Sequence, residues 1–166
     1  MLHIGVDEAG RGPVIGPLVV GCVCIPEGDI PMLVEAGVRD SKDLSKKKRE
    51  TIRAWFFENC QTRGWKYSVI SCPPSRIDIA VANKGLNILE TQLFAEAINK
   101  LALVGNDNGF MITNDACDVD EKRFTRRISA LIDQWPWPNS EMVSFHKADE
   151  NYPIVGMASI LAKQHR

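Results

Sequence analysis

Two acidic side chains stand next to each other near the start of the chain. Asp7 and Glu8 belong to the stretch "GVDEAGRGPVIGP", in which a short apolar strand expected over 2–7 runs into a glycine-rich turn. Adjacent carboxylates repel each other and raise each other's pKa, so a buried strand gains no stability from them. A positively charged partner is therefore expected close to this pair.

Two further aspartates are predicted to lie beside them. Asp115 ends the strand expected over 110–115, and Asp149 follows the strand expected over 141–146. The ends of strands in an open α/β sheet converge on one cleft, where these carboxylates would repel each other without cations. Oxygen donors without His or Cys suit Mg²⁺ or Mn²⁺, and two such ions about 4 Å apart promote in-line attack at phosphorus. The candidate ligands are Asp7, Glu8, Asp115 and Asp149.

The acids also have a plainer interpretation. The chain holds 21 Asp and Glu residues, and several of the others stand near the expected ends of helices and strands. Asp118 and Asp120 precede the apolar positions of the helix expected over 120–135 and suit the role of helix caps. The pattern of acids by itself leaves both the metal site and the helix caps open.

The glycine-rich turn admits two interpretations. Gly10, Gly12 and Gly16 loosely resemble a dinucleotide-binding loop, but such a loop must open directly into a helix. Here Pro13 and an apolar, β-branched stretch follow, which is typical of a strand, so a nucleotide cofactor is disfavoured. The turn instead allows backbone N–H groups and the Arg11 guanidinium to approach a sugar or a phosphate closely.

The elements that must position these residues alternate along the chain. The stretch "LVVGCVCI" (18–25) is apolar on both faces and is expected to be covered on both faces within a sheet. Ser45 is placed to cap a helix. Together the patterns predict an α/β sheet with helices on its faces. The expected strands are 2–7, 18–25, 65–72, 110–115 and 141–146, and the expected helical regions are 45–60, 77–104, 120–135 and 153–166.

Composition excludes several classes of protein. The chain has 166 residues, 45% hydrophobic and 25% charged, which suits one globular domain, and its net charge is −1. Basic clusters at 39–53 and 122–127 suit either a solvated helix face or a surface for a polyanion. Five cysteines without zinc-ligand spacing argue against a zinc site or a disulfide framework. No signal peptide or membrane span is apparent, so a cytoplasmic location and no membrane partner are expected.

Several stretches together resemble the ribonuclease HII family, also called type 2 ribonuclease H, and its archaeal branch more than its bacterial one. The first is the N-terminal "GVDEAGRGPVIGPLVV". The likeness continues in the family's order over nearly the whole chain. The further stretches are "RDSKDLSKKKRE" (39–50), "LNILETQLFAEAIN" (86–99), "DACDVDEKRF" (115–124) and "HKADENYPIVGMASILAK" (146–163).

The resemblance implies a metal-dependent endonuclease of the ribonuclease H-like fold, a mixed five-stranded sheet with helices on both faces. Such an enzyme uses two ions to hydrolyse the RNA strand of an RNA/DNA hybrid, or to cut at a ribonucleotide in duplex DNA. The products carry 5′-phosphate and 3′-hydroxyl ends. By motif, the metal-binding and catalytic acids fall on the same four residues as above. Gly10, Arg11 and Gly12 match the loop that senses the ribose 2′-hydroxyl, and Lys42 and Lys147 match basic positions near the phosphates, although both also suit surface lysines.

The match also has departures. Met157 stands where the family's small-residue run has alanine, and no "GSGYPSDP"-like segment with its junction-stacking tyrosine occurs in the 166 residues. We therefore expect one catalytic domain over 1–166 without the family's C-terminal helical segment, with its oligomeric state open. The first hypothesis is an active endonuclease. A hybrid- or metal-binding domain with little turnover is the alternative, and a two-metal exonuclease of the same fold is a third.

Overall fold

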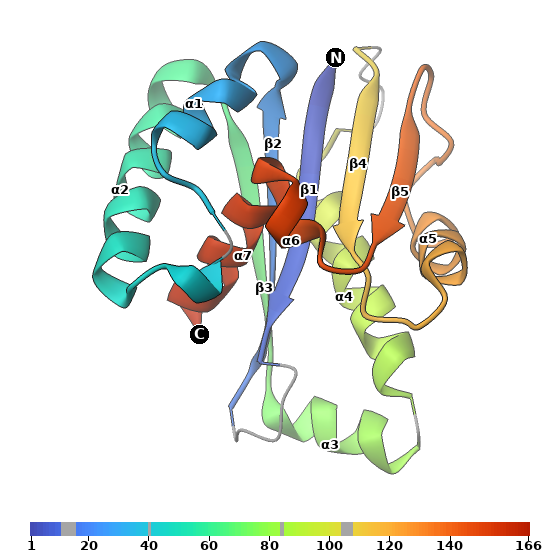
Figure 1. Cartoon of the computed structure of the whole chain (residues 1–166). Helices are drawn as coiled ribbons and strands as arrows, with labels where there is room; N and C mark the ends of the chain where they lie inside the picture. Colours follow the sequence, from blue (N-terminus) through green and yellow to red (C-terminus); the bar gives the residue numbers. More distant parts are fainter. Residues whose placement is uncertain (11–15, 40, 84, 104–107) are drawn as a thin grey trace.

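The computed structural model describes residues 1–10, 16–39, 41–83, 85–103 and 108–166 (Figure 1). Five strands form one sheet in the order β3-β2-β1-β4-β5. β2 pairs antiparallel with β1 and β3, whereas β4 pairs parallel with β1 and β5, so the sheet is mixed as expected. The strands are β1 (Leu2–Ala9), β2 (Leu18–Pro26), β3 (Lys66–Cys72), β4 (Phe110–Asp115) and β5 (Glu141–Phe145).

Helices cover both faces of the sheet, which confirms the expected architecture. One hydrophobic cluster joins α1, α2, α6 and α7 to one face, and the other joins α3, α4 and α5 to the opposite face. Figure 1 shows α7 lying across β1 and β2. The helices are α1 (Ile30–Glu35), α2 (Lys46–Arg63), α3 (Pro74–Ala82), α4 (Leu86–Lys100), α5 (Glu121–Ser129), α6 (Ala148–Asn151) and α7 (Pro153–His165), with short 3₁₀ turns η1 (Glu27–Asp29) and η2 (Ser41–Asp43).

Two sequence signals are confirmed directly. β2 is buried from Leu18 to Ile25, as a strand apolar on both faces must be, and it lies between β1 and β3. The Ser45 side chain accepts a hydrogen bond of 3.0 Å from the backbone N–H of Lys48 and begins α2. The helix ends at Gly64, whose φ of 70° is the left-handed conformation that glycine tolerates.

α7 is pressed against the backbone of the sheet at two glycines. A Cβ on Gly5 would collide with the backbone carbonyl of Ile154, and one on Gly21 would collide with the carbonyl of Ala158. Because there is no side chain at either position, the helix approaches β1 and β2 more closely than ordinary packing allows. This contact fixes the position of α7 on the sheet, and with it the positions of the side chains that α7 carries.

Two expected helices are shorter than their patterns. The region 77–104 divides into α3 and α4, with Asn83 and Gly85, both poor helix formers, at the break. α5 ends at Ser129 because the chain then tightens into turns, with the Leu131 N–H donating to the Ile128 carbonyl at 2.9 Å. Leu131, which follows the end of the helix, is 47% exposed.

Candidate active site

Asp7 and Asp115 lie side by side on neighbouring parallel strands. Val6 of β1 pairs with Asn114 of β4, so the residues that follow them, Asp7 and Asp115, lie level with each other on the two strands. Asp115 ends β4 as expected, but β1 continues to Ala9, so Asp7 lies inside its strand rather than at the end. Residues level on parallel neighbours face the same side of a sheet, which here is the side that α6 and α7 cover.

Asp149 completes this group from α6, a helix of four residues that follows β5. Its backbone N–H donates to Oδ2 of Asp115 at 3.2 Å. One carboxylate oxygen from each of Asp7, Asp115 and Asp149 lies within 4.8 Å of the others. We call these three residues the acid cluster. The structure thus brings together side chains that lie up to 142 residues apart in the chain.

Glu8 stands beside the acid cluster rather than in it. Glu8 follows Asp7 in β1, so its side chain leaves the strand on the opposite face of the sheet, and the residue is half-buried. It nevertheless lines the same pocket of about 310 Å³ as the acid cluster. All four predicted acids therefore border one pocket, with three of them at ligand spacing.

Burial and mutual repulsion oppose the ionisation of Asp7 and Asp115. Asp7 is 4% exposed, and its pKa is raised well above the usual value, first by burial and then by the charges of Glu8 and Asp115. Burial, with Asp149 next, raises the pKa of Asp115 to about 8. Without a cation these side chains destabilise their own charged forms.

Lysines border the pocket without neutralising it. Lys42 and Lys147, which the resemblance assigns to positions near the phosphates, both line it, and so does Lys163 of α7. In the part of the chain that the structure describes, no lysine, arginine or histidine forms an ion pair with the acid cluster. Among the described residues, the acid cluster thus has ammonium groups at the rim of its pocket but no ion-pair partner.

Lys42 owes its place to a buried contact below it. The hydroxyl groups of Ser41 and Ser159 lie 2.8 Å apart and join η2 to α7. The Arg49 guanidinium donates to the carbonyls of Ser41, at 3.3 Å, and Leu44, at 2.8 Å. These bonds hold η2 at the edge of the pocket.

Four lining residues were not predicted from the sequence: Ala116, His146, Ser159 and Lys163. His146 and Lys163 stand in the stretch "HKADENYPIVGMASILAK" that carries part of the family resemblance. A single histidine and a lysine on an apolar helix have no distinguishing pattern of their own. Only the packing of α7 and the turn after β5 places them at the acid cluster.

Gly10 lies in a neighbouring pocket. It has a φ of 98° and lines a pocket of about 420 Å³ together with Gly16, Arg49, Lys163 and Arg166. Lys163 borders this pocket and the acid pocket, so the two are adjacent. Arg11 and Gly12, the other residues of the predicted ribose-sensing turn, lie outside the described residues.

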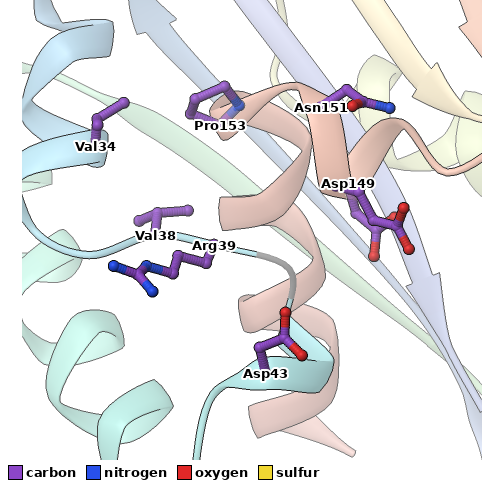
Figure 2. Close-up of a pocket in the computed structure, with 8 residues that line it drawn as sticks. Val34, Val38, Arg39, Asp43, Asp149, Asn151 and Pro153 are labelled. Carbon is purple, nitrogen blue, oxygen red and sulfur yellow. The ribbon is translucent and has the colours of Figure 1, made fainter.

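A larger pocket of about 570 Å³ lies on the other side of Asp149 (Figure 2). It is bordered by Arg39 and Asp43 near η2 and by Glu150 and Asn151 of α6. Figure 2 shows Arg39 and Asp149 among the residues that line it. Only one member of the acid cluster reaches this pocket, so it lacks the converging carboxylates that distinguish the smaller one.

The acids that suited helix caps have separate roles. Asp120 caps α5, accepting a hydrogen bond of 3.0 Å from the Arg123 N–H. Asp118 is not the cap, because its side chain accepts from the Asp120 N–H and from the Arg123 guanidinium. The Arg123 partner lowers the pKa of Asp118 to about 2. Both residues are thus satisfied within the protein, unlike the acid cluster.

The donor set of the acid cluster fits a divalent cation. It consists of carboxylate oxygens alone, the ligands that Mg²⁺ and Mn²⁺ prefer. The raised pKa values of Asp7 and Asp115 and the lack of ion pairs in the described chain mean that a bound cation would relieve repulsion. Asp7, Asp115 and Asp149 are placed to hold such an ion, and Glu8 lines the same pocket.

Comparison with known proteins identifies the family. The model of the family described as ribonuclease HII matches residues 4–166. The chain belongs to the ribonuclease HII family. The ribonuclease HII of Methanococcus maripaludis strain C5 is 43% identical over 164 residues, which are 98% of this chain and 64% of that protein. The chain therefore spans slightly less than two thirds of the length of that curated relative.

Solved structures support the same assignment. The ribonuclease H2 of Pyrococcus horikoshii superposes with a TM-score of 0.83 and 38% identity, covering 100% of this chain and 72% of that one. The ribonuclease HII of Archaeoglobus fulgidus, solved in complex with PCNA, superposes with a TM-score of 0.76 and 34% identity. The match covers 99% of this chain and 71% of that one. These ribonuclease HII structures confirm the ribonuclease H-like fold and the archaeal resemblance. Among the described helices, none combines the length and apolar character needed to cross a membrane.

Proposed function

We propose that this chain is a metal-dependent endonuclease that hydrolyses the RNA strand of RNA/DNA hybrids. Membership of the ribonuclease HII family supports this activity. The observation that carries the proposal is the acid cluster, in which three carboxylates converge within 4.8 Å without an ion pair among the described residues. A domain that only bound a hybrid would gain nothing from this repulsion.

The acids would act as metal ligands. Asp7, Asp115 and Asp149 would hold Mg²⁺ or Mn²⁺, with Glu8 contributing from the edge of the same pocket. When bound, a pair of such ions supplies an activated water and stabilises the departing 3′-oxygen, which leaves 5′-phosphate and 3′-hydroxyl ends. Burial of Asp7 holds this ligand in one place and excludes bulk water from the floor of the pocket.

The lysines at the rim would bind the substrate backbone. Lys42, Lys147 and Lys163 border the pocket and could approach phosphates on either side of the scissile bond. Gly10, in the adjacent pocket, would let the backbone approach the ribose, whose 2′-hydroxyl distinguishes RNA from DNA. We assign Arg11 and Gly12 to the same recognition on the basis of the family motif. This arrangement also suits a single ribonucleotide within duplex DNA.

Cleavage of two labelled substrates tests the proposal. One is a full RNA/DNA hybrid and the other a DNA duplex with one ribonucleotide, each with Mg²⁺, Mn²⁺ or chelator. We expect metal-dependent internal cuts with 5′-phosphate and 3′-hydroxyl ends, and none from the Asp7→Asn variant. Stepwise loss of terminal nucleotides would indicate an exonuclease instead. Binding of the hybrid by folded protein without any cleavage would indicate a domain that binds without turnover.

A further inference from the structure

The two segments that carry Asp115 and Asp149 are tied to each other directly after their strands. β4 ends at Asp115, and the chain then runs through 116–120 into α5. The N–H of Ala116 donates to the Phe145 carbonyl at 2.9 Å, so the segment after β4 begins in contact with the end of β5. Beyond this bond the two strands have ended, and the Asp149 N–H that donates to Oδ2 of Asp115 at 3.2 Å is one contact that sets the distance between the two acids.

His146 supplies further contacts between the two segments. Its ring Nε2 lies 2.7 Å from the backbone carbonyl oxygen of Asp118, across the gap between the two segments. Its backbone N–H donates to Oε2 of Glu121 at 2.6 Å, and its ring Nδ1 lies 3.4 Å from the same oxygen. A single residue of the turn after β5 therefore holds both the segment after β4 and the first turn of α5.

The point to which His146 is bonded is itself immobilised. Asp118 is 1% exposed, and the Arg123 Nε donates to its Oδ2 at 2.8 Å. The Asp120 N–H donates to Oδ1 of Asp118 at 3.0 Å, and Arg127 approaches Oδ2 at 3.8 Å. The Asp118 carbonyl is thus a rigid anchor, because the residue's own carboxylate is fastened to α5.

The turn that Asp149 depends on needs such an anchor. Lys147 has a φ of 55°, a left-handed conformation that is uncommon for residues other than glycine. α6, which carries Asp149, has only four residues and is too short to be stable by its own hydrogen bonds. The position of the Asp149 carboxylate therefore depends on the turn before it as well as on the burial of Ala148 in the core.

We infer that His146 is a positioning residue, whose bonds to Asp118 and Glu121 hold the turn after β5 against the segment after β4 and keep Asp115 and Asp149 at the spacing of metal ligands. The inference rests on the proposed metal site. Groups that orient metal ligands without touching the ion change affinity by roughly 10–100-fold when removed. Loss of the His146 ring would leave all three ligand residues present but allow the distance between Asp115 and Asp149 to vary.

The side chain is well suited to a test of this kind. The His146 side chain is half-exposed, so replacing it removes contacts without opening a cavity in the core. His146→Ala deletes both ring contacts and keeps the backbone bond to Glu121. His146→Gln restores an amide N–H near the position of Nε2, where it can donate to the Asp118 carbonyl. Asp29→Asn is the matched control, because Asp29 accepts from Arg63 at 2.8 Å and from Trp65 at 2.8 Å, and none of these residues lines the acid pocket.

Binding of Mn²⁺ to the metal-free proteins, followed by electron paramagnetic resonance, gives the decisive readout, with thermal stability measured in parallel. We expect His146→Ala to weaken Mn²⁺ binding about tenfold, His146→Gln to recover most of it, and Asp29→Asn to lower the melting temperature without changing Mn²⁺ binding. Equal Mn²⁺ affinity of His146→Ala and the unmodified chain would overturn the positioning role. If the unmodified chain did not bind Mn²⁺ at all, the proposed metal site would fail, and this inference with it.

Discussion

Two groups of acids lie close together in this protein and behave in opposite ways. In the acid cluster, burial and neighbouring charges raise the pKa of Asp7 well above its usual value and raise that of Asp115 to about 8. Three residues beyond Asp115, the buried Asp118 has a pKa lowered to about 2 by its hydrogen bond to Arg123. Burial is common to both groups, and the difference is the nearby cation.

That difference separates a functional group of acids from a structural one. Asp118 forms its ion pair inside the chain and so adds to the stability of the loop before α5. The acid cluster has no such partner among the described residues and lowers stability until a ligand supplies positive charge. Substitutions that remove a negative charge should therefore change the stability of the fold in opposite directions in the two groups of acids.

The largest effect is expected from Asp7→Asn. Removal of a metal ligand should reduce hybrid cleavage by more than the roughly 100-fold upper range for groups that merely orient ligands. Because the buried charge disappears, the same variant should melt at a higher temperature than the unmodified chain in chelator. Cleavage assays and thermal melting in chelator measure the two effects. Unchanged cleavage would remove Asp7 from the site, and a lower melting temperature would contradict the proposed repulsion.

Asp118→Asn should show the reverse pattern. Loss of the charged hydrogen bonds to Arg123 should lower the free energy of unfolding by about 1–2 kcal/mol with or without chelator. Urea denaturation measures this change, and Asp120→Ala, which removes the α5 cap, is a useful companion of comparable size. A gain in stability on neutralising Asp118 would show that the two groups of acids do not differ as described.

The pH dependence of the metal-free protein sharpens the comparison further. The folded-state pKa of Asp115, about 8, lies above the ordinary value of 3.8, so the folded state holds this proton more tightly than the unfolded state. The resulting stability is complete below about pH 4 and is lost as the pH rises toward 8. Melting temperatures across this range in chelator should fall, and Mn²⁺ should remove much of the fall near pH 8. Asp115→Asn should flatten the profile in chelator, and an unaltered slope would contradict the assignment.

The smallest effect concerns the cations around the two groups. Lys163 borders the acid pocket without an ion pair in the described chain, whereas Arg127 lies 3.8 Å from the Asp118 carboxylate. Lys163→Ala should weaken hybrid binding severalfold and reduce its salt dependence by about one phosphate contact, without changing the melting temperature. Arg127→Ala serves as the control and should lower stability slightly while leaving the salt dependence unchanged. Binding titrations at several salt concentrations measure the difference.

Local patterns were sufficient for most elements of the fold. The apolar stretch at 18–25 predicted a strand covered on both faces, and the Ser45 cap predicted the start of α2; both are confirmed. The break between α3 and α4 was missed because apolar residues at helical spacing occur on both sides of Asn83 and Gly85, and only local backbone preferences separate the two helices. The unexpected α6 has four residues, too few for a periodic signal.

The candidate site divides in the same way. The expected ends of separate strands suggested that Asp7, Glu8, Asp115 and Asp149 belong together, and the family motifs selected the same four residues. Which of them reach ligand spacing was not readable, because it depends on the register between β1 and β4 and on the turn at Lys147. Lys163 and His146 could not be recognised at all without the packing of α7 and the contact with Asp118.

The sequence by itself determined the class of fold and the family, and it predicted the four acids that border one pocket, because apolar periodicity, strand ends and motif blocks are local properties of the chain. Only the tertiary structure decided which acids ionise at a cost in stability and which are neutralised by a neighbouring arginine. Asp115 and Asp118 stand three residues apart and look alike in the sequence. Their difference comes from partners brought by other elements: other carboxylates around Asp115, and the arginines of α5 around Asp118. Electrostatic energy depends on distance and burial in space, which the order of residues does not contain.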